Sequence, residues 1–239
     1  VDGAVSTNNL TPTVSGTAGV DNGETVSVTL TPTTGGVVNA VAIAADGLWN
    51  VTPGLSEGVW TIVAEATDAA GNIGTATQIL TIDTTPPDVA ITSSNLTNSV
   101  SPTITGTAEA GATIAVSIDT VVVNSAVAGD GTWSATPTND LGNGAHGVTV
   151  IATDAAGNTS TVSQTLVVDL VLPVVGINPG TTDLTNDQTP MISGTADVLL
   201  GSTVEVSIDG ASALMPLVQA NGWNVTSAFL AAGDHVIVA

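Results

Sequence analysis

Apolar and polar residues alternate along short segments of this chain. The clearest segment is 113–119, where Ile114, Val116 and Ile118 would lie on one face of an extended chain and the residues between them on the other. Alternation with a period of two predicts a strand that is buried on one face. Similar segments separated by turn residues predict seven strands in the middle of the chain, at 89–92, 103–108, 113–119, 121–128, 132–136, 146–153 and 161–169. So many short strands in so short a stretch predict an antiparallel β-sandwich.

The same blocks of sequence recur along the chain. Gly16-Thr17-Ala18 returns at Gly106 and again at Gly194, and the five residues Asp68–Asn72 return at 154–158. A tryptophan block and an alternating apolar segment recur in the same order. Such self-similarity, with a period near 88 residues, indicates a tandem array of one structural unit. We therefore predict an all-β chain of sandwich domains arranged end to end, with domains at 1–84, 85–170 and 171–239.

Both outer domains are expected to be incomplete. Residues 5–8 align with 95–98, so the first domain begins slightly inside the unit, and the third stops at Ala239, before its last strand. A sandwich without its last strand exposes an open edge and part of its core. Two interpretations follow: the sequence is a window of a longer array, or the chain is a filament subunit that is completed by a strand from an identical neighbour.

The charge composition excludes several classes of function for this chain. The chain has 21 Asp and Glu residues and no Lys or Arg, which gives a formal net charge of −21. Nucleic-acid binding and a polybasic membrane patch both need basic side chains, so we expect neither. The absence of cysteine excludes disulfides and thiol catalysis, and the apolar stretches are too short to span a bilayer. The carboxylates must therefore face water or bind a metal cation.

Three blocks carry a resemblance to a known family. The segments 102–108, 129–134 and 153–159 resemble bacterial immunoglobulin-like (BIg-type) repeats, and the likeness extends over essentially the whole chain. The resemblance implies tandem immunoglobulin-like β-sandwiches in the extender region of a large secreted adhesin of the bacterial cell surface, such as the biofilm adhesins. It also implies that Ca²⁺ often stiffens the array, and that the partners are the neighbouring repeats and, in a fibre, identical chains.

Several acidic residues are expected to lie close together at one end of a domain, where a bound cation would offset their repulsion. In a course of seven alternating strands, the second, fourth and sixth connections all return to the end of the domain at which the first strand begins, here called the leading end. Acidic residues of these connections would meet the linker 83–88 there, with no basic side chain to offset their repulsion. Ca²⁺ takes six to eight oxygen ligands, so it would remove that repulsion. Pro86, Pro87 and Pro173 restrict the hinges between domains.

We therefore predict a Ca²⁺ site at the first junction, with Asp83, Asp154 and Asn158 as the principal ligands. The further candidates are Asp88, Glu109 and Asp130 at the same junction, Asp21, Asp68 and Asn72 at the leading end of the first domain, and Asp169 and Asp197 at the second junction. Binding at the second junction is expected to be weaker, because the position of Asp88 is apolar there. The alternative is that 68–72 and 154–158 are only tight turns, in which Asp caps backbone amides and Gly takes a positive φ.

Little in the sequence favours catalysis. His146 and His235 occupy the same position of the repeat, where the first domain has Trp60, so we expect a surface or half-buried strand site and no enzyme. The tryptophans are expected to fill the sandwich cores. A structural extender of an extracellular adhesin or surface fibre is the favoured function. The alternatives are a module that binds a carbohydrate or a host protein, which would need an exposed aromatic platform, and an accessory linker in a secreted enzyme.

Overall fold

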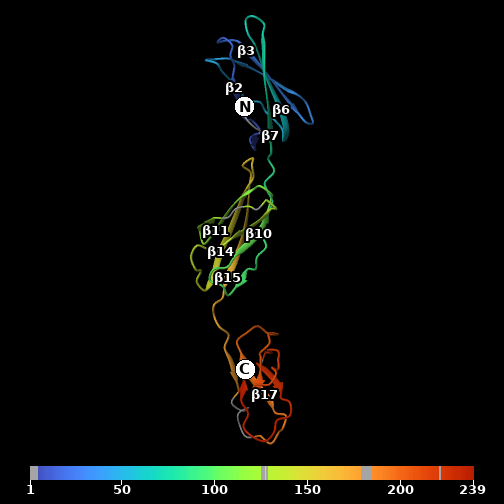
Figure 1. Cartoon of the computed structure of the whole chain (residues 1–239), viewed down its shortest axis with the longest axis vertical. Coiled ribbons are helices and arrows are strands. Elements are labelled where there is room, and N and C mark those ends of the chain that lie inside the picture. Colours follow the sequence, from blue (N-terminus) through green and yellow to red (C-terminus); the bar gives the residue numbers. More distant parts are fainter. Residues whose placement is uncertain (1–4, 125–126, 128, 179–184, 221) are drawn as a thin grey trace. The chain divides into compact units, whose positions relative to one another are not determined.

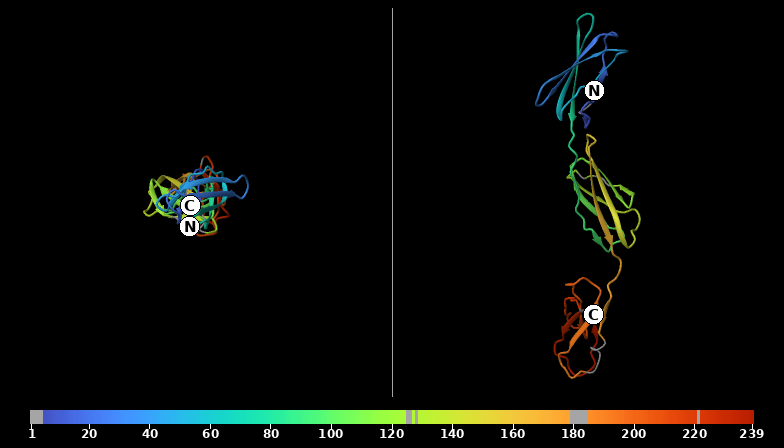
Figure 2. Two further views of the ribbon diagram at one scale, coloured as in Figure 1. Left: turned by 90° about the horizontal axis from the view of Figure 1, so that it is seen from above. Right: turned by 180° about the vertical axis from the view of Figure 1, so that it is seen from behind.

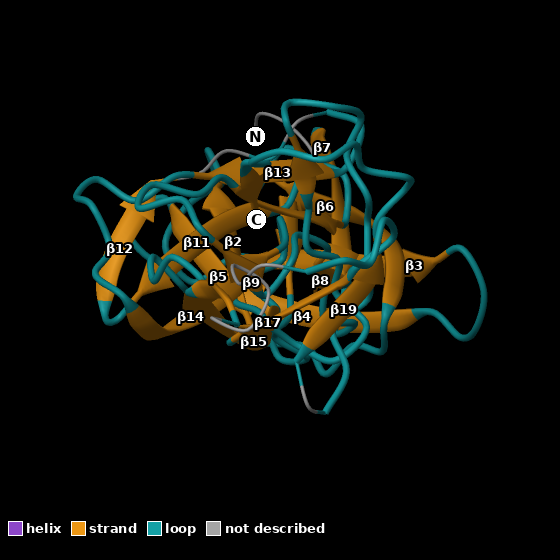
Figure 3. Ribbon diagram, turned by 90° about the horizontal axis from the view of Figure 1, so that it is seen from below, coloured by secondary structure: helices purple, strands orange, loops and turns teal. Residues whose placement is uncertain are grey.

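The structure is a computed structural model that describes residues 5–124, 127, 129–178, 185–220 and 222–239. Within these ranges every regular element is a β-strand, as Figure 3 shows, so none of them offers a helix that could cross a membrane. The chain divides into two compact units, Val1–Leu170 and Val171–Ala239. Unit 1 contains two separate apolar cores, one in each of the first two repeats, and unit 2 contains a third. The predicted all-β class is confirmed.

Repeat 1 is a sandwich of two sheets (Figure 1). One sheet has five strands in the order β1-β7-β6-β3-β4, and the other pairs β2 with β5. The strands are β1 (Val5–Thr7), β2 (Val14–Thr17), β3 (Thr25–Pro32), β4 (Val38–Ile43), β5 (Leu48–Val51), β6 (Gly58–Thr67) and β7 (Ile73–Ile82). Val26, Val28 and Leu30 alternate along β3 and are buried between the sheets, while the residues between them are exposed or half-buried.

Repeat 2 has the same two layers, which Figures 1 and 2 present from opposite sides. Its sheets have the orders β13-β10-β8 and β12-β11-β14-β15-β9. The strands are β8 (Val89–Ile91), β9 (Leu96–Thr97), β10 (Ile104–Ala108), β11 (Thr113–Ile118), β12 (Val121–Asn124), β13 (Thr132–Ala135), β14 (Gly144–Thr153) and β15 (Thr159–Val168). All seven predicted strands are present, although part of the predicted 121–128 lies outside the described residues. The predicted core face of 113–119 is confirmed, since Ile114, Val116 and Ile118 are buried.

One strand pairing differs from the predicted antiparallel order. β9, which was not predicted, runs parallel to β15, and β1 runs parallel to β7 in the same way. The physical reason lies in the strand count. In a course of seven alternating strands the first and the last run in the same direction, so they can only pair in parallel. The first strand of repeat 2 is divided into β8 and β9, which join different sheets, and β9 supplies this pairing.

The recurring glycine and tryptophan blocks form one packing unit. Trp133 is buried, and its indole N–H donates a hydrogen bond of 3.1 Å to the carbonyl of Thr107. The ring lies against Gly106, where a Cβ atom would come within 2.2 Å of the indole. Trp49 and Trp223 make the same bond to Thr17 and Thr195. The predicted core position of the tryptophans is confirmed, and the glycine is explained by the ring that covers it.

Unit 2 has fewer strands among its described residues. Its strands are β16 (Val175–Ile177), β17 (Met191–Ala196), β18 (Ser207–Ile208), β19 (Trp223–Thr226) and β20 (Ile237–Val238), in sheets β16-β17-β19 and β18-β20. Ile192, Val206 and Trp223 form the centre of its core. A hollow of about 490 Å³ opens beside this core and is lined in part by Ile192 and Ile237.

Candidate functional site

The loop Asp154–Asn158 joins β14 to β15 and is held by its own hydrogen bonds. Asp154 Oδ1 accepts from the backbone N–H groups of Ala156 and Asn158, both at 2.8 Å, and Oδ2 accepts from the Asn158 side-chain amide at 2.8 Å. Gly157 takes a φ of 93°, a conformation in which glycine is favoured. Burial opposes ionisation of Asp154, but these hydrogen bonds outweigh it and lower the pKa of its carboxyl group.

Repeat 1 covers this loop. The Asn158 side-chain amide donates a second bond of 2.8 Å to the carbonyl of Asp83, and the N–H of Asn8 donates a bond of 3.1 Å to the carbonyl of Ala156. Ala156 and Asn158 are only 9% and 8% exposed. The loop therefore contacts the end of repeat 1 at the point where β1 and β7 both finish. The prediction that the sixth connection of repeat 2 meets the incoming linker is confirmed by these contacts.

The linker that leaves repeat 1 is held by a residue that sequence reasoning missed. Glu57 accepts hydrogen bonds from the hydroxyl groups of Thr84 and Thr85, the latter at 3.2 Å. The bonds from these two side chains lower the pKa of the Glu57 carboxyl group. Asn143 takes the equivalent position in repeat 2, where its Oδ1 accepts from the N–H of Leu170 at 2.7 Å. Both residues directly precede a glycine of positive φ, and that pattern was the available signal.

The other acids predicted at this junction take part in hydrogen bonds that involve backbone groups. The N–H of Glu109 donates to the carbonyl of Asp88 at 3.0 Å, while Asp130 Oδ1 accepts from the N–H and the hydroxyl of Thr132. These bonds lower the pKa of the Asp130 carboxyl group. Asp83 Oδ1 accepts from the N–H of Thr85 at 3.0 Å. Nowhere in the described parts of the chain do three acidic or histidine side chains gather as a group that could hold a metal ion.

Among the described residues, no hydrogen bond joins Asp21 to the other two candidates at the leading end of repeat 1, Asp68 and Asn72. Asp68 and Asn72 form a loop with the same internal bonds as Asp154–Asn158. Asp21 is exposed, and its carbonyl accepts from the N–H of Glu24. Beside it, Asn22 binds Asp46 through two hydrogen bonds of 2.6 and 3.2 Å, an arrangement the sequence did not indicate.

The candidates at the second junction belong to different units. In unit 1, the N–H of Asp169 donates to the carbonyl of Thr97 at 2.9 Å. In unit 2, Asp197 and Val174 exchange two hydrogen bonds, of which the one to Asp197 Oδ1 measures 2.5 Å. The Asp197 carboxylate therefore holds the chain that enters β16.

The chemistry of the first junction is compatible with calcium. The Asn158 amide nitrogen stands 2.8 Å from two oxygens, Asp154 Oδ2 and the Asp83 carbonyl. Carboxylate, carbonyl and amide oxygens are the ligands that Ca²⁺ prefers. The amide satisfies both oxygens without a metal, and a rotated amide would present its own oxygen to the same point. The residues thus fit either a capped turn or a cation, so the predicted metal ligands stay a prediction.

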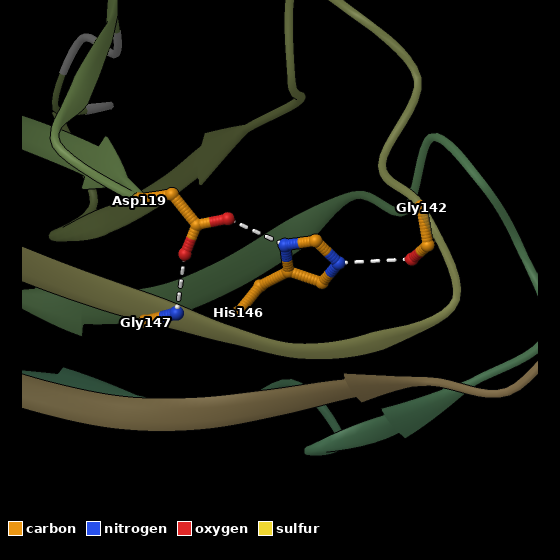
Figure 4. Close-up of polar contacts among 4 residues, drawn as sticks. All are labelled: Asp119, Gly142, His146 and Gly147. Atoms are coloured by element: carbon orange, nitrogen blue, oxygen red, sulfur yellow. Dashed lines mark hydrogen bonds and ion pairs between the residues drawn. The ribbon is translucent and has the colours of Figure 1, made fainter.

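A second polar cluster joins a histidine to an aspartate across two strands. His146 Nδ1 lies 2.5 Å from Asp119 Oδ2, and Nε2 lies 2.9 Å from the carbonyl oxygen of Gly142 (Figure 4). Asp119 Oδ1 also accepts from the N–H of Gly147 at 2.8 Å. Asp119 lies in the turn after β11 with a φ of 48°, so this cluster holds that turn against β14.

The arrangement recurs in unit 2. His235 Nδ1 lies 2.6 Å from Asp209 Oδ2, and Nε2 lies 2.8 Å from the carbonyl oxygen of Ala231. In repeat 1 the same position is taken by Trp60, whose indole N–H donates a bond of 2.9 Å to the carbonyl of Ser56. In each case a ring N–H reaches the carbonyl four residues earlier. The predicted surface or half-buried strand site is confirmed for His146, which is half-buried in β14, whereas His235 lies before β20 and Trp60 is buried at 3% exposure. At all three positions the ring ties down the preceding loop.

The partners of each histidine favour its protonated, positively charged form. A carboxylate and a carbonyl both accept hydrogen bonds, so both ring nitrogens must carry a proton for both bonds to form. The bond to Asp119 and then the bond to the Gly142 carbonyl raise the pKa of His146. The bonds from His146 and from Gly147 lower the pKa of the Asp119 carboxyl group. In a chain without Lys or Arg, the two histidines are the only side chains that can carry a positive charge.

This charge predicts a pH dependence of stability. The contribution of His146 is complete below its ordinary pKa of about 6.5 and is lost as the pH rises through its raised pKa. The contribution of Asp119 is complete above about pH 3.9 and is lost as the pH falls through its lowered pKa. Replacing Asp119 by Asn should cost at most about 1 kcal/mol, since the pair is partly exposed.

The measurement is an NMR titration of both histidines combined with urea unfolding at several pH values. Asp119→Asn should bring the pKa of His146 back toward its ordinary value. It should leave His235 unchanged, because the groups that face His235 are Asp209 and Asp234. A His146 that titrates identically in wild type and Asp119→Asn would contradict the assignment.

The aromatic residues do not form a binding platform. Trp49, Trp60, Trp133 and Trp223 are all buried, and Phe229, which is the fifth and last aromatic residue of the chain, stands alone on the surface at 67% exposure. Stacking of a sugar ring needs an exposed aromatic face. The carbohydrate-binding alternative therefore gains no support from the position of these side chains.

Comparison with known families agrees with the repeat pattern. The family model Big_13, described as a bacterial Ig-like domain, matches residues 2–84 and 88–170. The resemblance stated from the sequence is thereby confirmed. No curated protein matches the chain.

Several solved structures are similar to the chain. A tetra-tandem repeat from the extending region of a large adhesion protein is 25% identical, with 98% of this chain and 71% of that chain covered and a TM-score of 0.35. A structure from a 1.5-MDa bacterial ice-binding adhesin is 22% identical, with coverages of 93% and 82% and a TM-score of 0.37. A Ca²⁺-stabilized, ice-binding adhesin of an Antarctic bacterium is 24% identical, with coverages of 98% and 69% and a TM-score of 0.35.

Proposed function

Because the chain belongs to the bacterial Ig-like domain family, we propose that it is a structural extender segment of an extracellular bacterial adhesin or surface fibre. The observation that carries the proposal is the covered loop Asp154–Asn158, through which repeat 2 is hydrogen-bonded to the end of repeat 1. An extender must limit the motion between its domains, and independent domain motion is the default where the contact is small. Specific bonds at the junction supply such a limit.

The linker supports the same role. Thr84 and Thr85 are tied to Glu57, and Pro87 is among the most deeply buried side chains of the chain. Pro86 and Pro87 have a fixed φ and lack an N–H group, so few conformations remain to this segment. The linker therefore acts with the loop contact to restrict the hinge.

In this proposal Ca²⁺ strengthens the junction further. The Asp154 carboxylate, the Asp83 carbonyl and the Asn158 amide oxygen would supply oxygen ligands, and the cation would offset part of the net charge of −21. An extracellular setting provides calcium at millimolar concentration, for which extracellular modules have dissociation constants of about 10⁻⁴ to 10⁻³ M. The role requires no catalysis. Strand exchange with an identical chain stays a prediction.

One experiment tests both parts of the proposal. Amide relaxation of the isotopically labelled chain is measured in EDTA and in 10 mM Ca²⁺, together with thermal melting. We expect repeats 1 and 2 to tumble as one body in both solutions. We expect Ca²⁺ to stabilise them by about 1.4 to 2.7 kcal/mol, from the affinity range above.

Amide relaxation and thermal melting test the two parts of the proposal independently. Independent tumbling of repeats 1 and 2 would overturn the extender role, whereas identical melting in EDTA and in Ca²⁺ would overturn only the role of calcium. Asp119→Asn is the matched control for a calcium effect, because Asp119 is bonded to His146 and lies outside the loop contact.

A further inference from the structure

One edge of the five-stranded sheet in repeat 1 is a strand without charged residues. β4 lies at the end of the order β1-β7-β6-β3-β4, and β3 is its only partner among the described strands. The hairpin of β3 and β4, residues 25–45, contains none of the 21 acidic residues of the chain. An edge strand presents a row of unpaired N–H and C=O groups, which proteins commonly protect with charged side chains, proline or a bulge. β4 has no proline, and its residues pair one-to-one with β3, so this edge lacks all three forms of protection.

The side chains on the outer face of β4 are mostly apolar and exposed. Val41 and Ile43 are 64% and 58% exposed, and Val37, which directly precedes the strand, is 52% exposed. The core of repeat 1 lies on the opposite face of β4, where Ala42 is buried. Exposed valine and isoleucine on an uncharged strand favour pairing with another strand. The fold of repeat 1 leaves these side chains unused, whereas a contact with a second strand would bury them.

The corresponding edge of repeat 2 is different. β12 lies at the end of the order β12-β11-β14-β15-β9, but it is only four residues long and begins two residues after Asp119. Asp119 is bonded to His146, so a carboxylate is held beside the start of this edge. A short strand and a nearby charge both protect an edge against pairing. The uncharged edge is thus a property of repeat 1 and not of the repeat pattern.

The acidic residues around the hairpin indicate which strand could pair with β4. Asp46 and Glu24 flank the hairpin at one end, whereas residues 33–37 at the other end are uncharged, and Glu65 in β6 is separated from β4 by β3. Two antiparallel copies of β4 centred on Ala40 place the acidic end of each beside the uncharged end of the other. The two Asp46 residues then stand more than about 30 Å apart, from the rise of an extended strand, while the Debye length at physiological salt is about 8 Å. A second copy therefore fits this edge, although each chain has a net charge of −21.

We infer that β4 is a self-association edge, at which two copies of this chain join antiparallel and extend their sheets into one. Pairing about Ala40 brings Val37 of each copy opposite Ile43 of the other, and two-fold symmetry repeats this apolar cross-strand pair. Every strand stays in its own domain, so the contact is not strand exchange. The inference goes beyond the proposed extender function, which concerns successive domains of one chain. A contact between two edge strands is small, so we expect a weak and transient association.

The test measures self-association of the full chain. Sedimentation equilibrium and amide NMR spectra are recorded at physiological ionic strength, from micromolar to millimolar concentration. We expect a dimer at the upper concentrations, with concentration-dependent shifts of the β4 amide signals and slower hydrogen exchange along β4. Raising the salt concentration should strengthen the dimer, because salt screens the repulsion between the two chains.

Two glutamate variants test the edge itself. Val41→Glu places two carboxylates about 7 to 8 Å apart as diagonal neighbours across the dimer, and it should raise the dissociation constant at least about tenfold. Val122→Glu is the matched control, since Val122 is 70% exposed on the corresponding edge of repeat 2, and it should leave the association unchanged. Urea unfolding at low concentration checks that both variants fold.

A spin label reports the orientation of the two strands without altering β4. The chain has no cysteine, so Ala45→Cys can be labelled at one position, and antiparallel pairing about Ala40 predicts more than about 30 Å between the two labels. Three results would overturn the inference. They are a chain that stays monomeric at millimolar concentration, an equal loss of association for Val41→Glu and Val122→Glu, and labels that lie side by side.

Discussion

Replacing Gly106 by alanine should destabilise repeat 2 by about 3 kcal/mol or more, which is the upper range for overpacking a core. A Cβ atom at this position would come within 2.0 Å of the carbonyl oxygen of Ala90 and within 2.2 Å of the Trp133 ring. The first of these neighbours is backbone that is paired in the β8–β10 ladder, so it cannot move aside without breaking that ladder. Urea unfolding followed by amide NMR signals of each repeat is the measurement.

Two glycines provide matched controls for this substitution. Gly16 holds the same position in repeat 1, but its nearest described neighbour is the Trp49 side chain at 2.8 Å, so Gly16→Ala should cost clearly less. Gly129 lies in repeat 2 without a positive φ, and no atom of the described residues lies within 4 Å of a Cβ added there, so Gly129→Ala should change stability by less than about 0.5 kcal/mol. Equal losses for Gly106→Ala and Gly129→Ala would refute the packing argument.

The fold could be predicted because its determinants are periodic. The alternation around Ile114, Val116 and Ile118 and the recurrence of the glycine and tryptophan blocks depend only on residue order. The reason for the glycine could not be predicted, because it lies in the contact between Gly106 and a ring 27 residues away. The parallel pair of β1 with β7 was missed because β1 is three residues long and carries little apolar signal.

The pairing of His146 with Asp119 and of His235 with Asp209 has a counterpart in the sequence, but the structure is needed to recognise it. Both repeats with a histidine at this position have Ser-Ile-Asp at the end of the third predicted strand, which places Asp119 and Asp209. Repeat 1, with Trp60, has Thr31 in place of the aspartate. The paired change is a contact signal between two strands. It is visible once the β11–β14 register brings Asp119 to the start of β14.

The acidic residues show why charge counts alone do not define a site. The second and sixth connections of repeat 2 do contact the linker, as the strand order predicts, through Glu109 with Asp88 and Asn158 with Asp83. The direction of three of these carboxylates is set locally, however, by the backbone N–H two residues later: Asp83 with Thr85, Asp130 with Thr132 and Asp154 with Ala156. Such short-range caps are turn chemistry, and the number of acids cannot reveal them.

Replacing Asp154 by alanine should be the second most damaging change, with a loss of about 2 to 3 kcal/mol in repeat 2. Its carboxylate accepts three hydrogen bonds of 2.8 Å, and bonds to a charged group contribute more than neutral ones. Without the carboxylate the Asn158 amide loses one of its two acceptors, so the bond to Asp83 that joins the repeats should also weaken. Urea unfolding gives the stability, and hydrogen exchange at Asn8 reports on the junction.

The same substitution in repeat 1 separates the turn from the junction. Asp68 accepts the same three bonds, but its loop is exposed, so water can replace them and Asp68→Ala should cost less than Asp154→Ala. Only Asp154→Ala should speed exchange at Asn8. Because hydrogen bonds lower the pKa of both carboxyl groups, both contributions should be lost as the pH falls through the lowered pKa. Equal losses at the two positions, with exchange at Asn8 unchanged, would mean that the loop acts only as a turn and that the contact between the repeats does not depend on it.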